Sequence, residues 1–177
     1  MADLKISALT SAITPLAGTE VVPLVQSSTT KKTAVSTLMG FGPVFRAYQN
    51  TSVSIANATA TVLPLNTEQF DTNSNYDPAT YQFTPTIAGY YQVNAVANYF
   101  PVGGGNCFIS VFKNGAEYSR GPYSSEVAPG LGVSDIIPMN GTTDYLDLRL
   151  FQASGISQTY NPGVNLCFMS AGLIRTT

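Results

Sequence analysis

The chain of 177 residues has no histidine and no tryptophan, and charged residues make up only 10% of it, well below the usual share of about a quarter. Without histidine the commonest general base and metal ligand is missing, so serine lacks its usual activating partner. We therefore expect no catalytic residue, no metal site and no cofactor. The net charge of −2 disfavours a nucleic-acid partner, because phosphate binding requires a basic surface.

Long apolar runs and clustered cysteines are also missing. No stretch reaches the roughly 18 apolar residues of a membrane span, and the N-terminus has no apolar signal core. We therefore expect synthesis in a cytosol and no membrane insertion. The two cysteines are too few for a disulfide framework. Cys107 and Cys167 each lie in an apolar strand pattern, which favours buried free thiols; a bond between them is the alternative.

Residues 74–93, SNYDPATYQFTPTIAGYYQV, combine turn formers with alternating apolar residues. Asp77 stands in the turn-forming part, and Phe83 belongs to a short run with the period of a half-buried strand. Pro85 ends that run because it has no amide to donate, and Gly89 permits a tight reversal. The segment is therefore predicted to form a β-hairpin.

From residue 43 onward, strands and turns alternate every 8–12 residues or so, the spacing of an all-β sandwich or barrel. The expected strands lie near residues 44–49, 59–64, 79–84, 90–100, 107–113, 133–138, 144–152 and 166–175. Asn114-Gly115 is the clearest hairpin turn, because a type I′ turn needs positive φ at both central residues. No helical periodicity of useful length is present.

Alternation along the strands predicts which side chains are buried. Val93 and Leu148 lie on the apolar faces of their strands and are expected to be core residues. The strand at residues 107–113 is apolar on both faces, because Phe108 and Phe112 lie opposite its aliphatic side chains. Such a strand is covered on both sides, and a second subunit would explain the outer cover.

The first forty residues contain no aromatic residue, and we treat residues 1–41 as an extended arm that precedes a knob at residues 42–177. Residues 20–26 and 31–36 alternate like two strands around a Ser-Ser-Thr-Thr turn. An isolated hairpin is marginal in water, so this one needs a surface to lie against; a disordered tail is the alternative. The residues expected to anchor the arm are Val21, Val22, Leu24, Val25, Lys31 and Lys32.

Several motifs of the knob occur in the order of a known pattern. They are Tyr76-Asp77-Pro78, Phe83-Thr84, Gly89-Tyr90, Val111-Phe112-Lys113-Asn114-Gly115 and Ala171-Gly172-Leu173-Ile174. Residues 44–177 thereby resemble the globular head shared by the first complement component and the tumour necrosis factor superfamily. The resemblance implies a jelly-roll sandwich of about ten strands, a tight homotrimer and no catalysis. The predicted subunit contacts are Tyr91, Val93, Phe108, Phe112 and Leu148.

Heads of this family sometimes bind calcium near one apex, and Asp71 and Asp77 flank a polar loop, DTNSNYD. The loop lacks the dense acidic spacing of a dedicated calcium site. A solvated loop is therefore the preferred interpretation, with calcium as the alternative.

The arm is similar to a segment at the N-termini of tailed-phage virion proteins; the similar residues are 6–38, ISALTSAITPLAGTEVVPLVQSSTTKKTAVSTL. This resemblance implies a phage structural protein, made in the host cytoplasm and carried on the virion surface. One hypothesis is a capsid decoration or cement protein on the major capsid protein. The other is a tail-fibre tip or receptor-binding knob that attaches to tail components and recognises host surface glycan. We favour the capsid slightly, because arm and knob follow each other without a shaft. A secreted lectin or cytokine is disfavoured by the missing secretion signal.

Overall fold

The computed structural model describes residues 21–34, 42–98, 105–125, 130–163 and 165–177. The chain divides into two compact units, residues 1–41 and 42–177. Across the described ranges every regular element is a β-strand, and no helix there has the length and apolarity to cross a membrane. The all-β class expected from the sequence is confirmed.

The first unit contains a two-stranded antiparallel hairpin of β1 (Val21–Gln26) and β2 (Thr29–Ala34). The two turn residues are Ser27 and Ser28, with φ of 50° and 60°. Positive φ at both positions is the requirement of a type I′ turn, whose twist suits a hairpin. The predicted hairpin is confirmed, but its turn has two residues rather than four.

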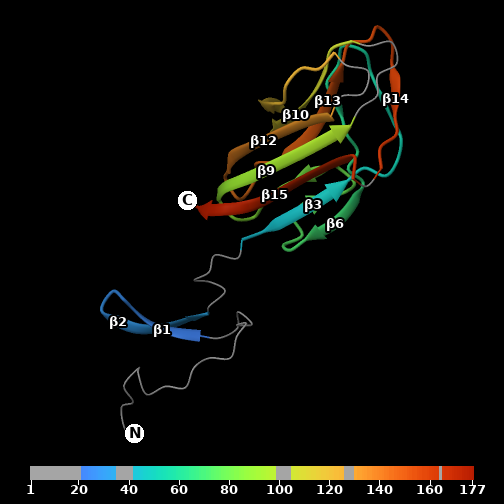
Figure 1. Cartoon of the computed structure of the whole chain (residues 1–177). Helices are drawn as coiled ribbons and strands as arrows, with labels where there is room; N and C mark the ends of the chain where they lie inside the picture. Colours follow the sequence, from blue (N-terminus) through green and yellow to red (C-terminus); the bar gives the residue numbers. More distant parts are fainter. Residues whose placement is uncertain (1–20, 35–41, 99–104, 126–129, 164) are drawn as a thin grey trace. The chain divides into compact units, whose positions relative to one another are not determined.

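The second unit, which we call the knob, is a sandwich of two main antiparallel sheets. Its strands are β3 (Val44–Tyr48), β4 (Val53–Ile55), β5 (Thr61–Val62), β6 (Thr67–Asp71), β7 (Tyr76–Asp77), β8 (Gln82–Phe83), β9 (Gly89–Asn98), β10 (Cys107–Lys113), β11 (Ala116–Arg120), β12 (Gly130–Met139), β13 (Leu146–Gln152), β14 (Gln158–Tyr160) and β15 (Cys167–Thr176). One sheet has the order β12-β9-β15-β3-β6, which can be followed in Figure 1. The other has the order β11-β10-β13-β8-β7, with β5 also paired to β13. A small third pair joins β14 to β4.

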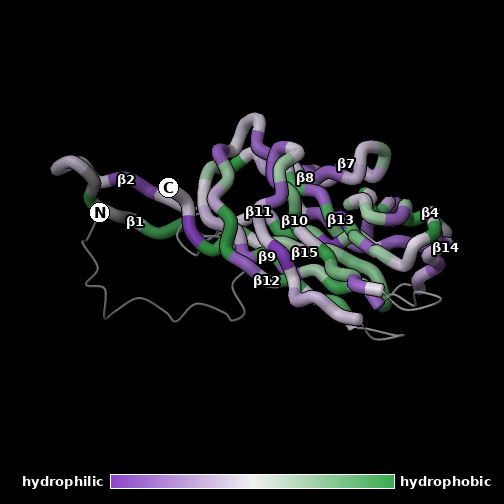
Figure 2. The backbone as a smooth tube through the Cα atoms, turned by 90° about the horizontal axis from the view of Figure 1, so that it is seen from above, coloured by the Kyte–Doolittle hydropathy of each residue, from purple (hydrophilic) through white to green (hydrophobic). Residues whose placement is uncertain are grey.

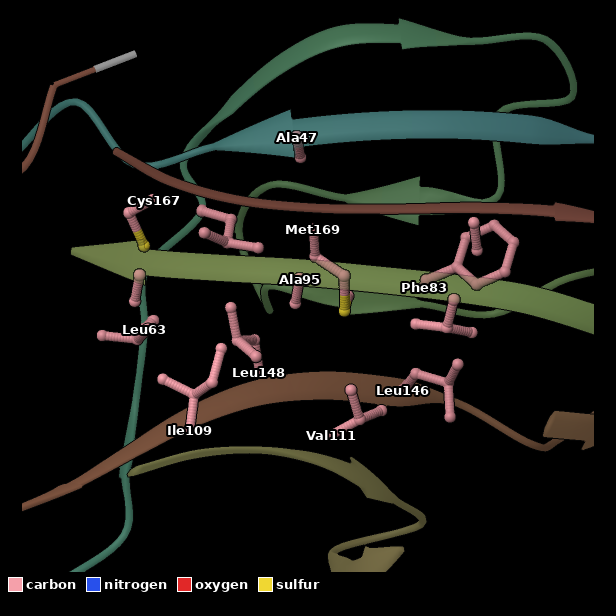
Figure 3. Close-up of a cluster of buried hydrophobic side chains, with 14 of the residues drawn as sticks. Ala47, Leu63, Phe83, Ala95, Ile109, Val111, Leu146, Leu148, Cys167 and Met169 are labelled. Atoms are coloured by element: carbon pink, nitrogen blue, oxygen red, sulfur yellow. The ribbon is translucent and has the colours of Figure 1, made fainter. Parts of the chain in front are cut away.

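The core lies between the two main sheets. Figure 3 shows side chains of β9 and β15 facing those of β10 and β13 across this space. Val93 and Leu148, the predicted core residues, are 1% and 0% exposed, so both predictions are confirmed. Aromatic rings fill one end of the core, where Phe45 stacks on Phe83 with ring centroids 4.2 Å apart.

The structure corrects the hairpin predicted for residues 74–93. Phe83 lies on β8 of the six-stranded sheet, whereas the long strand that begins at Gly89 is β9 of the five-stranded sheet. The chain therefore crosses from one sheet to the other after Pro85 instead of reversing within one sheet. Gly89 permits a close approach of two strands instead of the predicted reversal. A Cβ there would lie 2.3 Å from the carbonyl oxygen of Arg175, so glycine permits β9 to begin against β15.

Two other local predictions are confirmed. Asn114 and Gly115 have φ of 53° and 79° and connect β10 to β11 as a type I′ turn. Cys107 and Cys167 are free and buried. Burial raises the pKa of the Cys167 thiol to about 12, so it stays protonated and behaves as a small apolar side chain.

Candidate functional site

The acidic loop of residues 71–77 uses its carboxylates to fix its own backbone. The carboxylate of Asp71 accepts hydrogen bonds from the amides of Asn73, Asn75 and Tyr76 at 3.1, 2.5 and 2.6 Å. The Asp77 carboxylate accepts the Ala79 amide at 2.8 Å. Within the described residues no group of His, Cys, Asp and Glu side chains could hold a metal ion. The loop is thus arranged as a structural turn.

The outer face of β10 is covered by side chains of the same chain. The Phe108 ring stacks on Phe151 at a centroid distance of 4.8 Å and meets Tyr123 edge-on at 4.7 Å. The Arg120 guanidinium lies 4.5 Å from the centroid of the Phe108 ring, a cation–π contact. Phe108 is thereby only 5% exposed in a single chain. A second subunit is therefore not needed to explain the cover of Phe108, whose predicted role as a subunit contact stays a prediction.

The other end of the same face has a similar cover. The Arg149 guanidinium lies 4.1 Å from the centroid of the Phe112 ring. It also pairs with the buried carboxylate of Asp147 at 2.6 Å, which holds it in place over the ring. Phe112 remains half-buried, so a contact between Phe112 and a neighbouring subunit stays a prediction.

The remaining predicted subunit contacts lie inside the sandwich. Tyr91, Val93 and Leu148 are at most 1% exposed in the single chain. Their side chains have no surface to offer a neighbour, and we correct their assignment from subunit contacts to core. The reason is the strand period: alternate residues of β9 face the core, so the exposed face of that strand carries Gln92, Asn94 and Val96 instead.

The exposed face of the five-stranded sheet carries several apolar side chains. Val44, Phe70, Tyr90 and Ile136 are 39–51% exposed on its strands, and half-buried Val96 and Phe168 lie between them. We call Val44, Phe70, Val96, Ile136 and Phe168 the apolar sheet face. Strand register places them in neighbouring rows, since Val96 pairs with Phe168 and Gln92 lies beside Ile136. Polar side chains lie among them, since Asn94, Ser170 and Arg46 pair in the row between Val96–Phe168 and Ile136–Gln92. The face therefore combines apolar side chains with mostly neutral polar groups, on strands that are distant in sequence.

The polar groups of this face are mostly neutral and satisfied by one another. Ser134 donates to the Asn94 side chain at 2.8 Å, and the Gln92 amide donates to Ser134 at 3.0 Å. Arg46 stands near the centre, where its guanidinium lies 4.2 Å from the centroid of the Phe168 ring. Burying such a surface costs little desolvation free energy, because few groups on it carry a charge.

The arm residues singled out from the sequence lie on two strands of opposite character. Figure 2 shows β1 as mainly hydrophobic and β2 as mainly hydrophilic. Val21 and Val25 are 56% and 74% exposed, and Val22 is half-buried. Lys31 and Lys32 are exposed on β2, and the side chain of Leu24 lies outside the described residues. Exposed valines on a two-stranded sheet are a surface available to a partner.

No protein-family model and no curated protein matches the chain. Several solved structures match the chain. The globular domain of zebrafish complement 1qA protein aligns with a TM-score of 0.56 and 15% identity, over 77% of this chain and 99% of that chain. The PRD1 vertex protein P5 aligns with a TM-score of 0.55 and 21% identity, over 75% of this chain and 97% of that chain. Murine APRIL aligns with a TM-score of 0.58 and 9% identity, over 75% of this chain and 99% of that chain.

These likenesses, all below 25% identity, establish the fold. The knob is a jelly-roll sandwich of the kind found in complement and tumour necrosis factor heads, as the motif order implied. The similar structures include complement and cytokine heads and a phage vertex protein, which are non-enzymatic kinds of protein.

The electrostatics of the knob predict how its stability depends on pH. The Arg120 side chain, hydrogen-bonded to Glu117, lowers the pKa of Glu117, and the amide of Ala79 lowers the pKa of Asp77. A carboxyl with a lowered folded-state pKa stabilises the fold above its unfolded pKa and loses that contribution as the pH falls through the folded value. The melting temperature should stay nearly constant from about pH 5.5 to 8 and fall below about pH 4. Because the chain has no histidine, a transition centred near pH 6.5 would contradict this.

Proposed function

We propose that the protein is a non-enzymatic structural component of a bacteriophage virion, a homotrimer that its N-terminal arm anchors to the head surface as a decoration or cement protein. The observation that carries the proposal is the combination of two units. One is a knob whose fold is shared with the PRD1 vertex protein P5. The other is a hairpin with exposed valines that resembles the N-terminal segments of tailed-phage virion proteins.

The apolar sheet face supports the homotrimer. It spans all five strands of the sheet, most of its polar groups are neutral, and Ile136 and Phe70 are 51% and 45% exposed on it. The family that the knob resembles assembles as tight trimers, and a neighbouring copy of this chain is the occupant that this resemblance implies. We therefore place the subunit contact on this face, in place of the core residues first assigned to it.

The direct connection of arm and knob favours the capsid over the tail. Only residues 35–43 separate β2 from β3, too few to form a shaft that would hold a knob away from its attachment point. A knob joined to its anchoring arm by so short a segment suits a protein that lies on a shell and clamps neighbouring capsid subunits. Three arms on one trimer would act together, so that a weak contact per arm gives tight attachment through effective concentration.

The test is rebinding to virions from which the protein has been stripped. The full chain is expected to rebind, and a shortened chain of residues 42–177 is expected to remain trimeric in light scattering yet to lose rebinding. Equal rebinding of the shortened chain would place the attachment site on the knob. Gel densitometry of intact virions then separates the two locations, because a cement protein is present in many copies per particle and a fibre tip in few.

A further inference from the structure

The arm hairpin has two outer edges, and its register makes them chemically different. Gln26 and Thr29 flank the two-residue turn and form the closing pair of the ladder. In an antiparallel ladder, hydrogen-bonded and non-hydrogen-bonded pairs alternate from that point. The pairs Val25–Thr30 and Pro23–Lys32 are therefore non-hydrogen-bonded, and the backbone groups of these four residues point outward.

The outer edge of β1 is interrupted. Pro23, at the middle outward-pointing position of β1, has no amide hydrogen to donate, and proline on an edge strand blocks the addition of another strand. The outer edge of β2 has no such block, since Thr30, Lys32 and Ala34 each present an amide and a carbonyl on that side. Among the described strands, β1 alone pairs with β2. One edge of the arm is thus open to strand addition and the other is closed.

We infer that the β2 edge receives one extended strand of the receiving virion protein, and that this strand carries acidic side chains opposite Lys31 and Lys32. This inference rests on the proposed function and names the partner of its arm. The two lysines are consecutive, so they project to opposite faces of the hairpin and each meets a different residue of the added strand. Carboxylates at those positions would form favourable cross-strand pairs, whereas lysines there would repel.

A second copy of the arm is a poor occupant of the same edge. Three arms around a threefold axis could pair equivalently only if the β2 edge of one met the β1 edge of the next, which is the edge that Pro23 blocks. Contact between two β2 edges would join arms in pairs, place lysines of both chains side by side, and leave one arm of each trimer unmatched. The open edge therefore faces a different protein.

Two proline substitutions in the full chain test the edge, because Val25 and Thr30 are cross-strand partners at equal distance from the turn. Thr30→Pro removes an outward amide of β2, and Val25→Pro removes an outward amide of β1. Neither removes a hydrogen bond of the hairpin itself. Each proline variant is compared with the alanine variant at the same position, Thr30→Ala or Val25→Ala. Both variants lack the original side chain, so the comparison isolates the effect of the missing amide. The measurement is the affinity for stripped virions.

Thr30→Pro should bind at least about tenfold more weakly than Thr30→Ala, because three arms lose a backbone hydrogen bond together. Val25→Pro should bind within about twofold of Val25→Ala. Equal losses at both positions, or no loss at Thr30, would overturn the edge assignment. If the unaltered chain does not bind stripped virions at all, the proposed function fails and this inference fails with it.

The charge of the partner and the identity of the occupant are tested separately. Exchanging both Lys31 and Lys32 for Gln should weaken binding about two- to tenfold at low salt, and the difference should shrink at high salt, where surface ion pairs are screened. A loss that does not depend on salt would overturn the acidic character of the strand. Assemblies larger than trimers that form in the absence of virions and disappear with Thr30→Pro would show that the occupant is another arm.

Discussion

The Ile136→Arg chain is expected to run as a monomer in light scattering at micromolar concentration, where we expect the unaltered chain to run as a trimer. Ile136 is half exposed on β12 at the edge of the apolar sheet face, and its neighbour in the ladder is Gln92. An arginine there replaces an apolar side chain of that face by a charged one. A subunit contact would have to remove this charge from water in each of three copies, at a cost on the order of several kcal/mol per subunit.

The matched control is Ile156→Arg. Ile156 is 60% exposed in the loop between β13 and β14, away from the apolar sheet face. This chain should remain trimeric, and both altered chains should keep the far-ultraviolet spectrum of a β-sheet protein, since neither position belongs to the core. If Ile136→Arg remains trimeric while a charge at Phe112 separates the subunits, the contact lies at Phe112 on the six-stranded sheet, one of the subunit contacts expected from the sequence.

The second large effect is expected in the core. Leu148 on β13 is fully buried and lies between the two main sheets, where Figure 3 shows it near Ile109. Leu148→Ala should lower the free energy of unfolding by about 2–4 kcal/mol per subunit, through lost transfer energy and the cavity left behind. Denaturant unfolding measures this change in the free energy of unfolding. The protein concentration is kept fixed, because the stability of an oligomer depends on it.

Ile156→Ala serves as the control for this experiment, since truncating an exposed loop side chain should change the same free energy by less than about 0.5 kcal/mol. An unchanged unfolding curve for Leu148→Ala would mean that its strand presents the opposite face to the core.

Strand periodicity was enough to predict the core and the clearest turns. The alternation in β9 and β13 identified Val93 and Leu148 as buried, and Asn114-Gly115 identified its hairpin, because both signals are local. Strands with little apolar pattern were missed. β6 reads Thr-Glu-Gln-Phe-Asp and β14 has only three residues, and both are strands because neighbouring strands offer them backbone partners.

The subunit contact was harder to predict because local pattern does not show which groups cover a face. β10 is apolar on both faces, but its outer face is covered by Arg120 and Arg149 of the same chain, which are close only after folding. Conversely, the apolar sheet face is assembled from strands far apart in sequence, each contributing one of its side chains. Its composition follows from strand order, which periodicity does not encode.

The position of β15 has a consequence for synthesis. This strand, the last of the chain, lies between β9 and β3 and pairs with both along most of its length. During translation β3 and β9 leave the ribosome long before the strand that joins them, so the five-stranded sheet cannot close until residues 167–176 have been made. A chain that stops before β15 lacks the centre of that sheet, and with it part of the face on which we propose that the subunits meet. Synthesis of β15 would therefore have to precede association of the copies.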